Sequence, residues 1–160
     1  MSIKVLDNVF DKKYLTSLQN IISNNNNFPW YLVNNISDER NKDGYYFVHE
    51  FYKNHTINSN LFDTFLPFIE KINPKSLIRG KVNLYPNSDK IIEHGSHVDF
   101  NYSHNTFLFY LNTNNGFTRF NEEKVNSVEN RGVLFDGSIK HNSSNCTDKN
   151  YRITINLNYF

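Results

Sequence analysis

His97-Val98-Asp99 places an imidazole and a carboxylate two residues apart in the chain. On a β-strand alternate side chains point to the same face, so the two groups would project together. They are two thirds of a site with two histidines and one carboxylate. Such a site leaves coordination positions open and suits non-haem Fe(II). The pattern therefore predicts a metal site that a ligand from a distant segment completes.

The predicted third ligand is His141, which follows the apolar run 133–135 and a turn-prone segment at 136–138. Further on, Arg152 opens a segment, 151–157, that alternates strictly and places Arg152 and Thr154 on one face. Arginine offers a planar, bidentate fork that matches a carboxylate. An arginine in an otherwise apolar or small-polar strand therefore indicates an anion in the predicted site.

In this order, His97-x-Asp99, His141 and Arg152 resemble the active-site pattern of the Fe(II)/2-oxoglutarate-dependent oxygenases. The flanking segments resemble most closely the prolyl-4-hydroxylase-like branch, and they are Leu84-Tyr85-Pro86, Phe109-Tyr110-Leu111-Asn112, Gly116-Phe117-Thr118-Arg119-Phe120 and Phe135-Asp136-Gly137-Ser138-Ile139-Lys140-His141. The resemblance extends over residues 76–160.

The resemblance implies that His97, Asp99 and His141 hold a catalytic Fe(II) and that 2-oxoglutarate and dioxygen are co-substrates. A need for ascorbate is left open. The implied reaction hydroxylates an unactivated C–H bond and releases succinate and carbon dioxide. The implied substrate is a protein or peptide side chain, with proline as the leading candidate, and small metabolites remain open.

The resemblance also assigns a pocket for the co-substrate. Arg152 would bind the far carboxylate of 2-oxoglutarate, and the hydroxyl of Tyr110 would bond the same group. Thr154 would share this pocket face, and Tyr85 would line it together with Asn83. For the two tyrosines and Asn83, plain packing in the core is the alternative.

Three other functions are alternatives to the oxygenase. A cupin-like module that binds a metal and a ligand without turnover would need the three metal ligands but not Arg152. A nucleic-acid demethylase of the same fold would carry a second arginine soon after Arg152, and this chain has none there. A zinc hydrolase would need a general-base glutamate in a helical motif, which is also missing from the sequence. The roles of His94 and His104, and a role as a lid for the loop 37–44, are left open.

The predicted fold class is α+β and mainly β. Residues 76–160 would form a double-stranded β-helix, or jelly roll, from short strands separated by turns. Residues 1–75 would form an N-terminal helical buttress with added strands. The expected helices follow Asp11 and span 61–72, where Pro67 would kink or split the second. Residues 90–100 are predicted to be the strand that carries His97 and Asp99.

Composition narrows the class of protein further. A chain of 160 residues fits one domain, 1–160. A net charge of +1 with scattered basic residues disfavours nucleic acid and anionic membranes as partners. One cysteine, Cys146, excludes an intrachain disulfide. With no secretory or membrane-spanning apolar run, the expected location is the cytoplasm. The oligomeric state is not predicted.

Overall fold

The computed structural model describes residues 3–36 and 44–160. The helical elements are α1 (Lys12–Ile22), the 3-10 helix η1 (Phe62–Phe65) and α2 (Leu66–Ile72). The strands are β1 (Lys4–Leu6), β2 (Tyr31–Asn34), β3 (Tyr45–Lys53), β4 (Thr56–Ile57), β5 (Leu77–Pro86), β6 (Asn105–Tyr110), β7 (Phe117–Phe120), β8 (Glu123–Asn126), β9 (Arg131–Asp136), β10 (Asn142–Ser143) and β11 (Tyr151–Tyr159).

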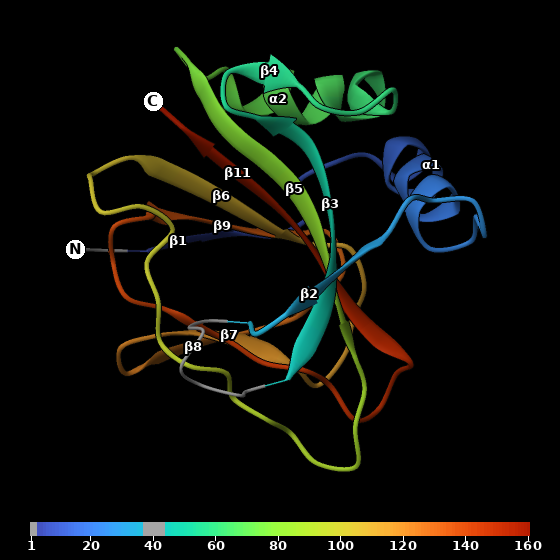
Figure 1. The fold of residues 1–160 in the computed structure, drawn as a ribbon, viewed down its shortest axis with the longest axis vertical. Helices are drawn as coiled ribbons and strands as arrows, with labels where there is room; N and C mark the ends of the chain where they lie inside the picture. Colours follow the sequence, from blue (N-terminus) through green and yellow to red (C-terminus); the bar gives the residue numbers. More distant parts are fainter. Residues whose placement is uncertain (1–2, 37–43) are drawn as a thin grey trace.

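The strands form two antiparallel sheets (Figure 1). The large sheet has the order β1-β9-β6-β11-β5-β3-β2, with β4 paired to β3. The small sheet has the order β10-β7-β8. Rings of Phe120 in the small sheet and Phe135 in the large one lie 4.7 Å apart between centroids. Two facing antiparallel sheets confirm the predicted mainly β architecture.

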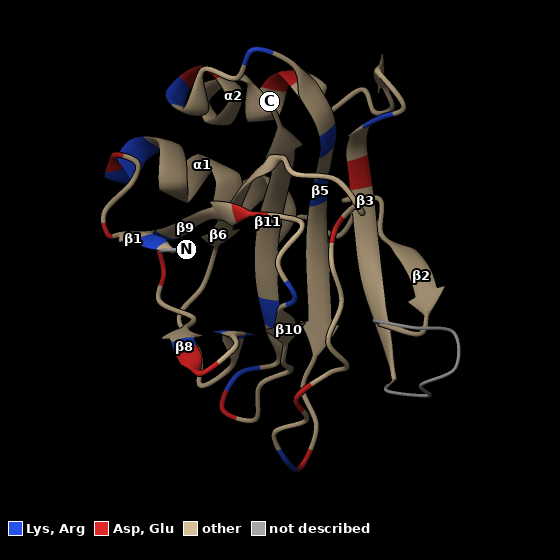
Figure 2. Cartoon of the chain, turned by 90° about the vertical axis from the view of Figure 1, so that its left-hand side faces the viewer, with Lys and Arg blue, Asp and Glu red and all other residues tan. Residues whose placement is uncertain are grey.

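The large sheet buries both of its faces, and strand β6 shows how. Phe107 and Phe109 pack into the core cluster that contains residues of α1 and α2. Leu108 and Tyr110 point the other way and pack with Phe120 and other residues of the small sheet. The period of two in a strand produces this division. The helices therefore cover one face (Figure 2), and the space between the sheets lies on the other.

The helices begin and end where the sequence predicts. Asp11 accepts a hydrogen bond from the backbone N–H of Tyr14 at 2.9 Å and caps α1, which ends at Ile22. Pro67 lies in the first turn of α2, directly after η1, so it splits the predicted second helix at a position that tolerates proline. Among the described residues, no helix combines the length and the apolar character needed to cross a bilayer.

The first 75 residues contribute strands to the large sheet as well as helices. Strand β3 pairs with β5 along most of its length, and β1 pairs with β9 at the opposite edge. The predicted loop 37–44 lies outside the described residues except for Gly44. The lid function considered for it therefore stays open.

The prediction of a strand at 90–100 is wrong. This segment is irregular and makes only two isolated bridges, between Glu93 and Ser144 and between His97 and His141. Its remaining backbone contacts are single hydrogen bonds, such as that from the N–H of Asp99 to the carbonyl of Gly137 at 2.9 Å. The alternation read from His97-x-Asp99 is thus not the alternation of a regular strand. Contacts with the segment 137–143 position these side chains instead.

Candidate metal centre and anion pocket

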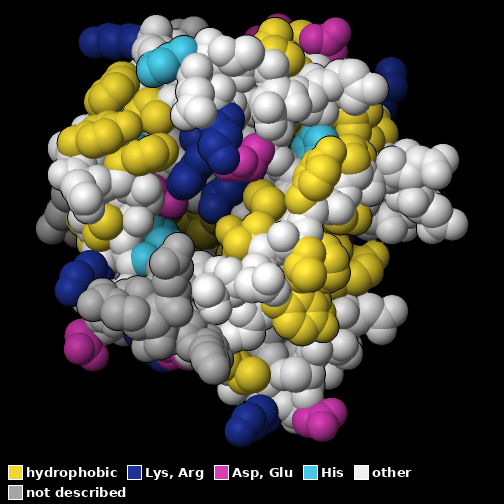
Figure 3. All heavy atoms as spheres, viewed as in Figure 1, with side chains coloured by type: hydrophobic (Ala, Val, Ile, Leu, Met, Phe, Trp, Pro, Cys, Tyr) yellow, Lys and Arg dark blue, Asp and Glu magenta, His cyan; other side chains and the backbone are white. Residues whose placement is uncertain are grey.

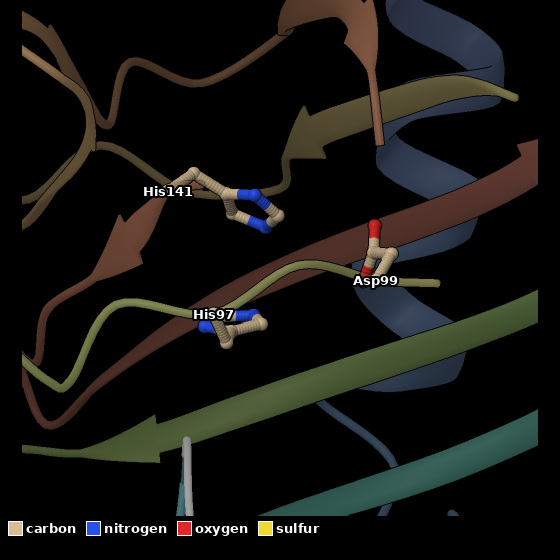
Figure 4. A group of neighbouring side chains, drawn as sticks. All are labelled: His97, Asp99 and His141. Carbon is tan, nitrogen blue, oxygen red and sulfur yellow. The ribbon is translucent and has the colours of Figure 1, made fainter. Parts of the chain in front are cut away.

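His97 and His141 are held side by side by their backbones. The N–H of His97 donates to the carbonyl of His141 at 3.1 Å, and the N–H of His141 donates back to the carbonyl of His97 at 2.9 Å. This is the hydrogen-bonded pair of an antiparallel ladder, which places two residues directly opposite each other. The ring centroids are consequently 4.5 Å apart (Figure 4).

Asp99 joins them from the same loop, and its carboxylate is buried. One carboxylate oxygen accepts from Nη2 of Arg79 at 2.8 Å, and the other accepts from Nδ2 of Asn158 at 2.8 Å. Burial opposes ionisation, but the charge of Arg79 and the bond from Asn158 outweigh it and hold the pKa of Asp99 well below its usual range. The carboxylate is therefore charged and oriented at neutral pH.

The three side chains suit a divalent transition metal. One ligand atom from each of His97, Asp99 and His141 lies within 4.8 Å of the others. A metal that binds such atoms at about 2.0–2.2 Å would bring neighbouring ligands to about 3 Å, which small side-chain rotations can achieve. Nδ1 of His141 donates to the carbonyl of Ile139 at 2.9 Å, so Nε2 keeps its lone pair for a metal. Burial, then the charge of His141, lowers the pKa of His97 to about 4, which keeps it neutral as a ligand must be.

The carboxylate of Asp136 holds the turn before His141, within the segment 136–138 that the sequence predicts to be a turn. Its carboxylate accepts from the N–H of Ser138 at 2.9 Å, from the hydroxyl of Ser138 at 2.6 Å and from the hydroxyl of Ser103 at 2.8 Å. A Cβ on Gly137 would lie 2.1 Å from Nε2 of His104, so only glycine allows this close approach. An acidic residue before Gly-Ser is a recognisable turn signal.

We expect Asp136→Asn to lower stability in a pH-dependent manner. Hydrogen bonds from Ser138 lower the pKa of Asp136 from 3.8 to about 2. Because the folded pKa lies below the unfolded one, the stabilisation is present above about pH 4 and is lost as pH falls towards 2. Because solvent screens this accessible carboxylate, urea unfolding should show a deficit of only ~0.5–1 kcal/mol for the variant near neutral pH, and the deficit should shrink in acid. An equal deficit at both pH values would contradict this role.

Arg152 is buried in the interior, with 1% of its surface exposed. Its guanidinium donates to the hydroxyl of Ser127 at 2.7 Å, to the carbonyl of Ser144 at 3.2 Å and to the hydroxyl of Thr118 at 2.9 Å. All three acceptors are neutral, and within residues 3–36 and 44–160 no carboxylate forms an ion pair with it. A buried charge without a counter-ion is costly, so this site is suited to an anion.

Arg152 lines one cavity together with His97, Asp99 and His141, the three side chains that could hold a metal. Its other walls are Lys81, Asn83, Tyr85, Leu108, Thr118, Ser143, Thr154 and Asn156. Thr154 and Tyr85, which the sequence analysis predicts to bind the co-substrate, are among these lining residues. The free volume of the cavity is only about 30 Å³. A dicarboxylate is larger, so its entry requires lining side chains to change rotamer.

Tyr110 lies behind Arg152 and is not among the residues that line this cavity. It is fully buried, its ring centroid is 5.4 Å from the guanidinium carbon of Arg152, and its hydroxyl donates to the carbonyl of Val125 at 3.5 Å. Burial raises the pKa of this phenol, which therefore stays protonated as a donor. The predicted bond to a carboxylate requires the hydroxyl to turn from Val125.

His94 and His104, to which the sequence assigned no role, lie next to the candidate metal centre and contact residues around it. Nδ1 of His94 lies 2.8 Å from the hydroxyl of Ser143, and its ring stacks on Tyr85, so it is not part of the triad cluster. His104 is buried beside Thr106 and Asn158, both of which also bond Asp99. His104 thus belongs to the shell that orients the carboxylate.

The sequence analysis missed the two cations on strand β5. Arg79, Lys81, Asn83 and Tyr85 alternate along this strand, and each is paired in register with a residue of β11, namely Asn158, Asn156, Thr154 and Arg152. These four residues lie on one face of β5. The alternation of residues 79, 81, 83 and 85 in the sequence could have predicted this. Lys and Arg side chains gather near a hollow on the surface over this part of the sheet (Figure 3).

Comparisons with known proteins show which proteins share this fold. The sequence matches no protein-family model and no curated protein. Among solved structures, an oxidoreductase of the 2OG-Fe(II) oxygenase family from Burkholderia pseudomallei is 13% identical with a TM-score of 0.71, over 98% of this chain and 84% of that one. A Pseudomonas putida prolyl-4-hydroxylase is 11% identical with a TM-score of 0.71, over 98% and 91%.

A prolyl hydroxylase from Trichoplax adhaerens, solved in complex with a peptide fragment of the hypoxia inducible factor oxygen degradation domain, is 17% identical with a TM-score of 0.63, over 99% of this chain and 83% of that one. These identities are low, so the likeness concerns the fold. The chain thus has the jelly-roll fold of the 2OG-Fe(II) oxygenases and prolyl-4-hydroxylases, the group that its histidine, aspartate and arginine motifs resemble.

Proposed function

We propose that this protein is an Fe(II)- and 2-oxoglutarate-dependent dioxygenase that hydroxylates an unactivated C–H bond. The buried, unpaired guanidinium of Arg152 in the cavity of His97, Asp99 and His141 carries this proposal. The fold shared with 2OG-Fe(II) oxygenases supports it. A cupin-like metal-binding module would explain the three ligands. It would not explain why the charge of Arg152 is buried without a counter-ion.

In this proposal, the residues of the cavity have separate roles in binding iron, binding 2-oxoglutarate and excluding water. The imidazoles of His97 and His141 and the carboxylate of Asp99 would hold the iron, and Arg79 and Asn158 would fix the direction of that carboxylate. Bound iron with 2-oxoglutarate and dioxygen supplies the oxidising power for C–H hydroxylation. Arg152 would bind the far carboxylate, while Tyr85 and Leu108 would keep water from that end of the cavity.

A protein or peptide side chain, with proline first, is the proposed substrate. The motifs resemble those of the prolyl hydroxylases, and the Trichoplax structure of the same fold holds a peptide. We further propose that residues 1–160 act as one unit and that the protein works in the cytoplasm, where reducing conditions suit ferrous iron and the buried thiol of Cys146. The absence of a second arginine after Arg152 argues against the nucleic-acid demethylase.

The proposal is tested by incubating the protein with cell extract, Fe(II) and 2-oxoglutarate, followed by mass spectrometry. We expect peptides or metabolites that gain one oxygen, together with release of succinate. The matched control is an incubation without 2-oxoglutarate, in which the gain should disappear. A protein that binds a divalent metal but neither binds nor consumes 2-oxoglutarate would support the binding module instead.

A further inference from the structure

Lys81 is a second cation of the cavity, and it lies beside the metal-ligating side chains. It is on strand β5 between Arg79 and Asn83, directly across from Asn156 of β11, and it lines the cavity with His97, Asp99 and His141. We propose that Lys81 binds a carboxylate of the primary substrate, so that this enzyme acts on an acidic amino-acid or peptide substrate. This inference rests on the proposed oxygenase function and adds its substrate class.

Among the described residues, no carboxylate forms an ion pair with the ammonium group of Lys81, and no acceptor forms a hydrogen bond with it. The nearest acidic groups are already engaged. Asp99 accepts from Arg79 and Asn158, each at 2.8 Å. Glu50, the cross-strand partner of Lys81 on β3, accepts from Lys53 at 2.6 Å. The aromatic contact of Lys81 is distant, with Nζ 6.0 Å from the ring centroid of Tyr46.

The protein only partly stabilises the charged form of Lys81. Burial, followed by the charge of Arg79, lowers the pKa of Lys81 to about 8. The charges of Asp99 and Glu50 act in the opposite direction but do not offset the burial, so a further anion close to the ammonium would stabilise its charged form. An anionic ligand that enters the cavity would remove this penalty, and binding at such a site is favoured because the protein has already desolvated the ammonium.

The co-substrate does not use up the positive charge. In the proposed complex, Asp99 balances Arg79, the far carboxylate of 2-oxoglutarate balances Arg152, and its other carboxylate meets the metal. Lys81 then remains unpaired, in a cavity that already carries the charge of the metal. A neutral substrate would leave this excess in place, whereas a substrate carboxylate would offset it.

Two amides beside Lys81 point to an N–H group on the same ligand. Oδ1 of Asn83 and Oδ1 of Asn156 are buried and lack a hydrogen-bond donor in the described structure. Asn83 is next but one to Lys81 on the same strand face, and Asn156 is opposite it. Buried acceptors of this kind are costly unless a ligand satisfies them. A carboxylate next to an N–H is the pattern of amino acids and peptides.

Two matched ligand pairs test the proposal. One pair carries the carboxylate of a single amino acid, and the other carries the side-chain carboxylate of a peptide. The single-residue pair is N-acetyl-L-proline, which is an anion, and N-acetyl-L-prolinamide, which is neutral. The peptide pair is N-acetyl-Pro-Asp-amide and N-acetyl-Pro-Asn-amide. Each is titrated by calorimetry into the anaerobic protein loaded with Mn(II) and 2-oxoglutarate. We expect the parent to bind the acidic member of one pair more tightly than its neutral partner by ~10- to 100-fold, as for a hydrogen bond to a charged group.

The variants assign this preference to Lys81. Lys81→Met should abolish it, and Lys81→Arg should retain part of it. Lys12→Met is the matched control, since it removes an exposed lysine of α1, on the opposite face of the large sheet, and the preference should persist. The inference would be overturned by any of three results. The parent could bind the acidic and neutral members equally, it could bind none of the four ligands, or the preference could survive in Lys81→Met.

Titration of 2-oxoglutarate separates the two proposals. Lys81→Met should bind 2-oxoglutarate within about threefold of the parent, because the inference gives the far carboxylate to Arg152. A much larger loss would show that Lys81 pairs with the co-substrate, which would overturn the inference and leave the oxygenase proposal intact. A parent protein that binds no 2-oxoglutarate would instead refute the proposed function.

Discussion

Arg152→Ala is expected to lower the affinity for 2-oxoglutarate by about two to four decades while metal binding persists. The variant leaves His97, Asp99 and His141 untouched but removes the cation from a pocket where it is 1% exposed. Breaking one side of a buried charge pair costs ~3–5 kcal/mol. At about 1.4 kcal/mol per decade, this gives the expected loss.

Two further variants should cause smaller losses of 2-oxoglutarate affinity. Arg152→Lys should recover only part of the affinity, because an ammonium cannot reproduce the planar fork that now also bonds Ser127 and Thr118. Tyr110→Phe should weaken binding less, by ~1.5–3 kcal/mol, the value of one hydrogen bond to a charged group. Arg119→Ala is the matched control, since it removes a half-exposed arginine that pairs with Glu93 on the surface.

The measurement is a calorimetric titration of 2-oxoglutarate into the anaerobic Fe(II) or Mn(II) form of each variant, after circular dichroism has shown that the β-fold is retained. Should Arg152→Ala bind 2-oxoglutarate as tightly as the parent, the oxygenase proposal fails. The metal-binding module would then be the better explanation of the site.

His141→Ala is expected to lose Fe(II) or Mn(II) binding by at least ~100-fold, since even loss of a residue that only orients a ligand costs 10–100-fold. The variant removes one of three protein ligands, while the backbone pair between residues 97 and 141 can persist because it uses only N–H and carbonyl groups. His97→Ala and Asp99→Ala should behave alike. The fold should remain, because the core of helices and large sheet does not include these residues.

His94→Ala is the matched control for this experiment. His94 is also buried, but its ring stacks on Tyr85 and its Nδ1 lies against the hydroxyl of Ser143. Metal affinity, measured by titration under anaerobic conditions, should stay close to that of the parent. If His94→Ala lost the metal and His141→Ala kept it, the triad assigned here would be wrong.

Local patterns in the sequence were sufficient for much of the scaffold. Asp11 and the helical spacing after it predicted α1, since a cap and a periodic apolar face act within a few residues. The strict alternation of 151–157 predicted β11 and the face that carries Arg152 and Thr154. Pro67 predicted the break before α2. All of these depend on interactions between residues close in the chain.

The same local reasoning failed at 90–100, because the period of two in His97-x-Asp99 does not reveal whether a neighbouring strand is present. The structure holds this segment by a few bonds to 137–143, which is distant in the chain. Asp136 holds its turn through local bonds to Ser138, and only its bond from Ser103 joins segments distant in the chain. Strand pairing between remote segments is a property of the tertiary structure.

By itself, the sequence determined which side chains could form a metal centre and an anion pocket, through the order His97, Asp99, His141 and Arg152 and through the alternation of the last strand. Only the tertiary structure decided that Arg79 neutralises Asp99, that Arg152 is buried without a counter-ion and that Lys81 faces the same cavity. The physical reason is that charge pairing and burial depend on distances across the sheets. Periodicity assigns a residue to a face, but it does not give the neighbours that determine its charge state and its partners.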